Sequence, residues 1–138
     1  MDKPTSVDMF VDATPKSVAV VFKAYGKTLT FAKRLPEDDA RSTNTAEYLA
    51  LISGLRMALK KGYRNLRVYS DSMLVVWQVK GKFKTRKKHL RDLRDIARLA
   101  IENFDYFYLQ HIPGEKNLAD KPSREVLKRG CTKIDTEV

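Results

Sequence analysis

Four acidic residues, the side chains best suited to metal binding or catalysis, lie in separate segments beside apolar stretches. They are Asp12, Glu47, Asp71 and Asp120. A carboxylate at the end of a buried strand or on an apolar helix face is costly unless it is paired or binds a cation. Carboxylates that converge repel one another and need cations to stay ionised. If these side chains meet, they predict a site for two Mg²⁺ or Mn²⁺ ions, which can promote phosphodiester hydrolysis.

Each acid also has a purely structural interpretation, and spacing alone leaves both interpretations open. Asp12 precedes Ala-Thr-Pro, a sequence in which an aspartate can organise a turn. Asp71 is placed to cap a following helix, and Asp120 to face the positive end of a helix dipole. Asn44 and Glu47 have the spacing of a capping box.

The composition indicates a basic, globular, single-domain protein. The net charge of +10 and the pI near 9.8 favour a polyanionic partner, nucleic acid ahead of an acidic membrane surface. A soluble protein that is merely basic is the alternative. Residues 1–130 are expected to form one domain and residues 131–138 a frayed tail. The single cysteine, Cys131, excludes an internal disulfide and fits a reducing compartment. No signal peptide is expected, and no apolar run is long enough to span a membrane.

The pattern of apolar residues predicts an α/β fold. Strands are expected at residues 7–12, 18–25, 28–32, 66–70 and 104–112, and helices at 45–61, 72–79, 86–103 and 118–128. Three strands joined by short turns, followed by strands separated by helices, give a mixed sheet covered by helices. If the first and fourth strands are parallel neighbours, Asp12 and Asp71 emerge at the same edge of the sheet. Glu47 near the start of the long helix, and Asp120 in the first turn of the last, can point to that edge.

Four local strings occur in the order seen in type 1 ribonuclease H. They are FVDAT at residues 10–14, TNTAEYLAL at 43–51, VYSDS at 68–72 and HIPGEKNLAD at 111–120. The chain resembles that family from about residue 7 to residue 127. The resemblance implies a ribonuclease H-like five-stranded mixed sheet in the order 3-2-1-4-5, flanked by helices. It also implies that Asp12, Glu47, Asp71 and Asp120 match the four metal-binding acids, and that Asn44 contacts the RNA strand.

The string NLADKPSR at residues 117–124 is similar to the endings of ribonuclease H domains fused to viral and retroelement reverse transcriptases. The string DATP at residues 12–15 points the same way, because cellular enzymes usually have Asp-Gly-Ser there. This implies a covalently linked polymerase domain and a location in the cytoplasm or in a viral or virus-like particle. A free-standing cellular ribonuclease H is the alternative.

The resemblance implies a metal-dependent endonuclease that hydrolyses the RNA strand of RNA–DNA hybrids with two ions per site. A catalytically inactive module that binds or tethers nucleic acid is the alternative, and a DNA-directed relative is a second one. We expect the isolated domain to be monomeric. Many family members carry a histidine shortly before the last acid. That position here looks like Glu115, and His111 is expected at the end of a strand.

Basic residues on the third helix are candidates for contacts with nucleic acid. Lys87, Arg91, Arg94 and Arg98 recur at i, i+4, i+7 and i+11, a stripe predicted to lie opposite the apolar face. They are expected to contact phosphates without reading sequence; the alternative is a solvated face partly neutralised by aspartates. Ser72 completes the predicted nucleic-acid-binding set. Asn44 is the candidate for a contact with the 2′-hydroxyl that distinguishes RNA from DNA.

Overall fold

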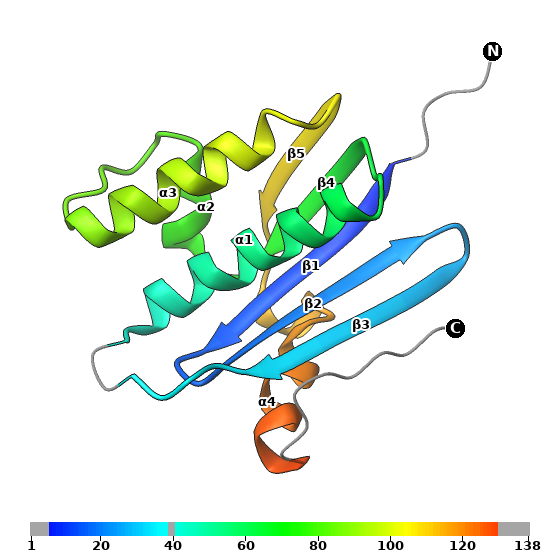
Figure 1. Ribbon diagram of the computed structural model, residues 1–138, viewed down its shortest axis with the longest axis horizontal. Coiled ribbons are helices and arrows are strands. Elements are labelled where there is room, and N and C mark those ends of the chain that lie inside the picture. The colour runs from blue at the N-terminus through cyan, green and yellow to red at the C-terminus, as the bar shows by residue number, and fades with distance from the viewer. Residues whose placement is uncertain (1–5, 39–40, 130–138) are drawn as a thin grey trace.

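The computed structural model describes residues 6–38 and 41–129, which form one mixed sheet with helices on both faces (Figure 1). The strands are β1 (Val7–Thr14), β2 (Ser17–Ala24), β3 (Lys27–Arg34), β4 (Asn65–Ser70) and β5 (Tyr106–His111). The helices are α1 (Thr43–Lys60), α2 (Met73–Val79), α3 (Lys88–Ile101) and α4 (Asp120–Arg129), with a 3₁₀ turn η1 at Gly114–Lys116. The sheet order β3-β2-β1-β4-β5 confirms the predicted ribonuclease H-like order. The predicted tail lies outside the described residues.

The sheet combines an antiparallel meander with two parallel strands. β1 pairs antiparallel with β2 and parallel with β4, and β4 pairs parallel with β5. β1 runs two residues further than predicted, because Thr14 still pairs with Ser17 before the turn at Pro15. Asp12 therefore lies inside the strand, opposite Ala19, and the interpretation of Asp12 as a turn residue is wrong.

Helix α1 packs on β1 and β2 through the odd-numbered residues of β1. Met9 and Val11 are fully buried there. Gly54 lies against them so closely that a Cβ at this position would stand 2.8 Å from the sulfur of Met9 and 3.2 Å from Cγ1 of Val11. The absence of a side chain at Gly54 thus sets the distance between α1 and the sheet. It thereby also sets the position of Glu47, two turns earlier in the same helix.

Helix α4 covers β1, β2 and β3 on the opposite face (Figure 1). Ala119 and Val126 are fully buried against Ala19 and Val21 of β2. The even-numbered residues of β1, including Asp12, face this side because side chains alternate along a strand. Within the two described ranges, no helix combines the length and the apolar character that crossing a bilayer requires.

Two serines cap the helices that follow the acidic segments. The Ser42 hydroxyl accepts a hydrogen bond from the backbone N–H of Thr45, because α1 begins at Thr43, two residues earlier than predicted. The Ser72 hydroxyl accepts from the N–H of Val75 at the start of α2. The capping-box interpretation of Asn44 and Glu47 is therefore wrong, as is the capping interpretation of Asp71. Both carboxylates are free of these structural roles.

Candidate metal centre

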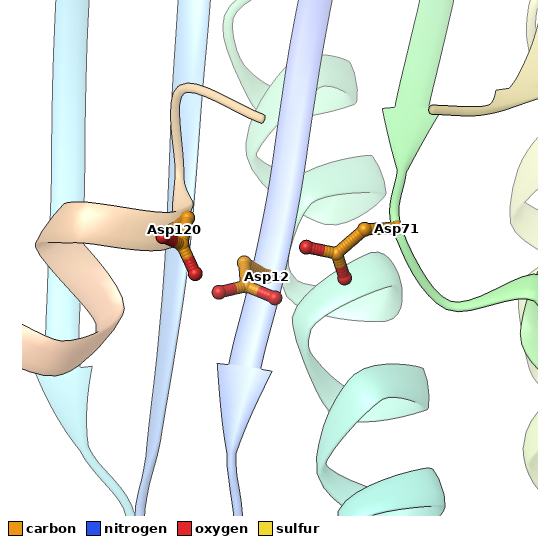
Figure 2. A group of neighbouring side chains, drawn as sticks. All are labelled: Asp12, Asp71 and Asp120. Carbon is orange, nitrogen blue, oxygen red and sulfur yellow. The ribbon is translucent and has the colours of Figure 1, made fainter. Parts of the chain in front are cut away.

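Three aspartates from distant parts of the chain converge at one edge of the sheet. Asp12, Asp71 and Asp120 each offer one carboxylate oxygen, and these oxygens lie within 4.8 Å of one another. Figure 2 shows the three side chains directed towards one space, Asp12 from β1, Asp71 from the end of β4 and Asp120 from α4. Three carboxylates this close are the arrangement that a hard divalent cation favours.

The fold explains why these side chains meet. β1 and β4 run parallel, and Val11 pairs with Ser70. The residues that follow these two, Asp12 and Asp71, therefore lie at the same height along the sheet. Asp120 is the first residue of α4, which packs on the face that Asp12 occupies. The predicted meeting of Asp12 and Asp71 at one edge is what the register produces.

Glu47 lies beside this cluster and is not part of the closely spaced trio. It is buried in α1, and its Oε1 has no hydrogen-bond partner among the described residues. Burial raises the pKa of Glu47, and the charges of Asp12 and Asp71 raise this pKa further, so its carboxylate lies within electrostatic reach of theirs. Of the four acids expected to converge, three share one space and the fourth stands next to it with an unused oxygen.

Two of the acids, Asp12 and Glu47, are in surroundings that disfavour their charged forms. Burial, helped by the charge of Asp71 and opposed by a hydrogen bond from Ser123, raises the pKa of Asp12 to about 7. Burial, with the charges of Asp12 and Asp71, raises the pKa of Glu47 to about 9. A cation offsets such repulsion and gives the orphaned oxygen of Glu47 a partner. The all-oxygen donor set and the unpaired buried oxygen therefore fit Mg²⁺ or Mn²⁺.

The raised pKa values predict how stability depends on pH without metal. Both folded-state pKa values lie above the ordinary values of 3.8 and 4.5, so the stability that these groups contribute is complete at pH 4. It is lost as pH rises through about 7 for Asp12 and about 9 for Glu47. In EDTA, we expect these two groups to lower the melting temperature by roughly 10 °C between pH 5 and pH 9. Added Mg²⁺ should restore more stability at pH 8 than at pH 5.

Thermal melts of an Asp12→Asn/Glu47→Gln variant provide the control. The other titratable groups are unchanged in this variant, so subtracting its pH dependence isolates the two acids. We expect its melting temperature to be higher than that of the wild type at pH 8 in EDTA and to respond weakly to Mg²⁺. If the melting temperatures of the two proteins changed with pH in the same way, ionisation of these two carboxylates would not destabilise the fold, and the prediction would be wrong.

A protein family described as reverse transcriptase-like matches residues 10–122, most of the chain. The chain belongs to this reverse transcriptase-like family. Ribonuclease HI of Halobacterium salinarum is 36% identical over 87 residues, which are 62% of this chain and 44% of that protein. The chain thus spans less than half the length of this curated relative. The resemblance to ribonuclease H is confirmed.

Solved structures of ribonuclease H proteins share the fold of this chain. Ribonuclease H1 from Halobacterium salinarum gives a TM-score of 0.79 at 26% identity, covering 91% of this chain and 98% of that chain. LC11-RNase H1, crystallised in complex with an RNA/DNA hybrid, gives a TM-score of 0.73 at 26% identity, covering 91% of this chain and 97% of that chain. The protease-reverse transcriptase of prototype foamy virus gives 0.60 at 15% identity, covering 91% of this chain and 21% of that chain. At that identity, the last likeness concerns the fold alone.

A buried polar network that sequence reasoning missed ties α4 to β1 beside the acids. The Ser123 hydroxyl lies 2.8 Å from Oδ2 of Asp12 and 2.8 Å from the backbone oxygen of Asp120. The Ser17 hydroxyl donates to the backbone oxygen of Ser123. The Asn117 amide donates to the backbone oxygen of Val11 at 2.9 Å. The string NLADKPSR, which drew attention as a family signature, thus contains residues that set the spacing between two of the aspartates.

Ser123→Ala is expected to weaken metal binding without unfolding the protein. Ser123 is fully buried, and its hydroxyl holds Asp12 in one orientation, so its loss frees the carboxylate to rotate. Losing such an outer contact costs about 10- to 100-fold in metal affinity in comparable sites. Calorimetric titration with Mn²⁺ measures the effect. Ser123→Thr keeps the hydroxyl and should recover most of the affinity; an unchanged affinity in Ser123→Ala would show that the contact does not position Asp12.

The two predicted RNA contacts, Asn44 and Ser72, lie close in the sequence to acidic residues of the site. Asn44 is half-buried in the first turn of α1, three residues before Glu47, and therefore shares a face of the helix with it. Ser72 directly follows Asp71 and caps α2. Both residues border the edge where the acids meet, and their contacts with nucleic acid stay predictions.

The predicted basic stripe on α3 is only partly a surface feature. Lys87 and Arg91 are exposed. The Arg94 side chain is 21% exposed and forms an ion pair with Asp95 at 3.0 Å. Arg98 turns inwards, where its guanidinium donates to the backbone oxygens of Val79 and Gln78 at the end of α2. The prediction that the whole stripe lies opposite the apolar face is wrong for Arg98, because its end of α3 packs against α2.

The segment before the last acid approaches the metal centre through its backbone. A Cβ on Gly114 would stand 3.4 Å from Oδ2 of Asp71, so η1 lies directly against that carboxylate. Glu115 in η1 is exposed, and His111 at the end of β5 is half-buried and pairs with Ser70. A catalytic role for His111 or Glu115 stays open.

Proposed function

We propose that this chain is a metal-dependent endonuclease that hydrolyses the RNA strand of RNA–DNA hybrids. The observation that carries the proposal is the convergence of Asp12, Asp71 and Asp120, with the unpaired Oε1 of Glu47 beside them. Membership of the reverse transcriptase-like family and the likeness to a ribonuclease H1 crystallised with an RNA/DNA hybrid support it. The charge of +10 supports a nucleic-acid substrate.

The acids have distinct parts in the proposed reaction. Asp12 and Asp71 would together hold a pair of divalent ions, with Glu47 as a further ligand to one ion and Asp120 to the other. Such ions, when bound, stabilise the charge on the phosphodiester and lower the pKa of the attacking water. Ser123 keeps Asp12 oriented, and Arg124, 2.8 Å from Oδ2 of Asp120, restrains that carboxylate.

The reaction is a hydrolysis in which one bond forms and one breaks. The oxygen of a water molecule attacks phosphorus in line with the leaving 3′-oxygen, and the phosphorus–oxygen bond to that oxygen breaks. The attacking water gives up a proton, and the 3′-oxygen takes one up. The products carry a 5′-phosphate and a 3′-hydroxyl. Asn44, on the face of α1 that carries Glu47, is the residue proposed to contact the 2′-hydroxyl and select RNA.

A cleavage panel tests the proposal. Labelled RNA–DNA hybrid, duplex DNA, duplex RNA and each single strand are incubated with the protein in Mg²⁺ and in EDTA. We expect cuts in the RNA of the hybrid alone, only with Mg²⁺, and ends with a 5′-phosphate. Cleavage of duplex DNA would favour a DNA-directed relative. Tight binding to the hybrid without cleavage in Mg²⁺ or Mn²⁺ would favour an inactive tethering module.

The proposal extends to the setting of the domain. The chain corresponds to 21% of the foamy virus protease-reverse transcriptase and 44% of the curated halobacterial relative. We propose that it works with a covalently linked polymerase domain, in the cytoplasm or a virus-like particle, and that it is a monomer when isolated. Sedimentation velocity of the purified chain at several concentrations tests the last point.

A further inference from the structure

A groove of about 830 Å³ lies between α1 and β3, away from the metal centre. α1 packs on β1 and β2, and Figure 1 shows β3 running beyond this helix with no other helix on the same side. The helix layer of the described residues therefore stops one strand short of the edge of the sheet. No helix of residues 6–38 and 41–129 covers the side of β3 that faces this layer.

The floor of the groove is apolar. Val18 and Val20 of β2 and Phe31 of β3 line it from the sheet, and Met57 lines it from α1. Phe31 and Met57 are only partly buried although they pack against the main core. A partly covered apolar floor beside a packed core gains free energy when another apolar surface covers it, at roughly 25 cal/mol per Å².

The rim of the groove carries positive charge alone. Lys33 from β3 and Arg56, Lys60 and Lys61 from the α1 side line it, and no acidic residue does. Lys33, Arg56 and Lys60 are exposed and form no ion pair with any residue in the described ranges. Arg56 and Lys60 stand four residues apart and so project from one side of α1. This charge pattern favours an anionic partner.

The groove opens on the side of the sheet opposite to the metal centre. Asp12 and its strand partner Ala19 face α4, whereas Val18 and Val20 face α1. Arg56 and Lys60 lie more than two turns of α1 beyond Glu47, at the end of the helix away from the acids. A polyanion would also leave the apolar floor uncovered. The charge and the floor together favour a protein partner over the substrate.

We infer that the groove docks an acidic amphipathic helix of a partner protein. An α-helix is about 10 Å wide, close to the width of two strands, so one more helix beside α1 fits over β3 and completes the layer. Its apolar stripe covers Phe31 and Met57, and its acidic flanks meet Arg56 and Lys60. This mode of recognition is the helix-in-groove type. It is independent of the proposed catalytic function.

A designed peptide tests the inference. The probe is a fluorescein-labelled 18-residue helix with leucines at i, i+3, i+4 and i+7 spacing and glutamates on the flanks, titrated by anisotropy in about 150 mM salt. We expect a dissociation constant in the micromolar range for the wild-type chain. Arg56→Glu/Lys60→Glu should weaken binding at least about tenfold, and Met57→Gln several-fold. A scrambled peptide of the same composition should bind at least about tenfold more weakly.

The matched control reverses two charges elsewhere. Lys87→Glu/Arg91→Glu removes the same charge from α3 and should leave peptide binding within about twofold. Equal losses in the two double variants, or equal binding of the scrambled peptide, would reduce the effect to general charge attraction and overturn the inference. Loss of hybrid binding in Arg56→Glu/Lys60→Glu would overturn it in favour of nucleic acid. Retained hybrid cleavage in that variant supports it, with circular dichroism confirming the fold.

Discussion

Replacing Asp71 by asparagine is expected to abolish hybrid cleavage, by at least about 1,000-fold, while hybrid binding changes by less than about threefold. Asp71 shares one space with Asp12 and Asp120, and the amide keeps its size but removes the charge that binds a cation. Phosphate contacts elsewhere on the basic surface supply most of the affinity for nucleic acid. Single-turnover cleavage in Mg²⁺ and anisotropy with a labelled hybrid measure the two effects.

Asp105→Asn is the matched control for this experiment. It removes one carboxylate on the surface, where Asp105 pairs with Arg64 at 3.0 Å, and should leave cleavage within about twofold. Normal turnover by Asp71→Asn would refute its assignment to the metal centre. If hybrid binding fell as much as hybrid cleavage, the result would instead show that Asp71 contributes to binding of the substrate.

Gly54→Val is expected to have the largest effect on stability, about 2 to 3 kcal/mol in the free energy of unfolding. A Cβ at this position would stand 2.8 Å from the sulfur of the buried Met9 and 3.2 Å from Cγ1 of Val11, which is too close for van der Waals contact. Helix α1 must therefore move away from β1. Urea denaturation measures the change. Cleavage should fall as well, because Glu47 moves with the helix.

A second substitution separates this clash from a general intolerance of valine in the helix. Met9→Ala removes the sulfur and methyl group that lie closest to Gly54. We expect the double variant to be more stable than the sum of the single effects by more than about 1 kcal/mol. Strict additivity would show that crowding between α1 and β1 is not the cause.

Much of this fold is readable from local patterns. The β-branched and aromatic residues at 18–25 and the alternation at 28–32, with Gly26 between them, predicted the β2–β3 hairpin that the structure contains. The separation of the later strands by helices allows β1 and β4 to pair in parallel, and the resemblance to ribonuclease H implied the order in which they are neighbours. The meeting of Asp12 and Asp71 is a consequence of that pairing, so it could be expected before any coordinates.

Other features depend on long-range contacts that spacing does not encode. The hydrogen bond between Ser123 and Asp12 joins residues 111 positions apart, and only the docking of α4 on the sheet creates it. The inward turn of Arg98 depends on where α2 ends. Helix caps were misplaced because Ser42 and Asn44 are both good capping residues, and the first turn of α1 decides between them.

Manganese anomalous diffraction from crystals soaked in Mn²⁺ tests the central claim most directly. The account predicts at least one strong peak within about 2.5 Å of carboxylate oxygens of Asp12 and Asp71, with Asp120 or Glu47 as a further ligand. Manganese bound only at other surfaces, or an acidic cluster that stays free of metal while the carboxylates hold protons at neutral pH, would contradict it.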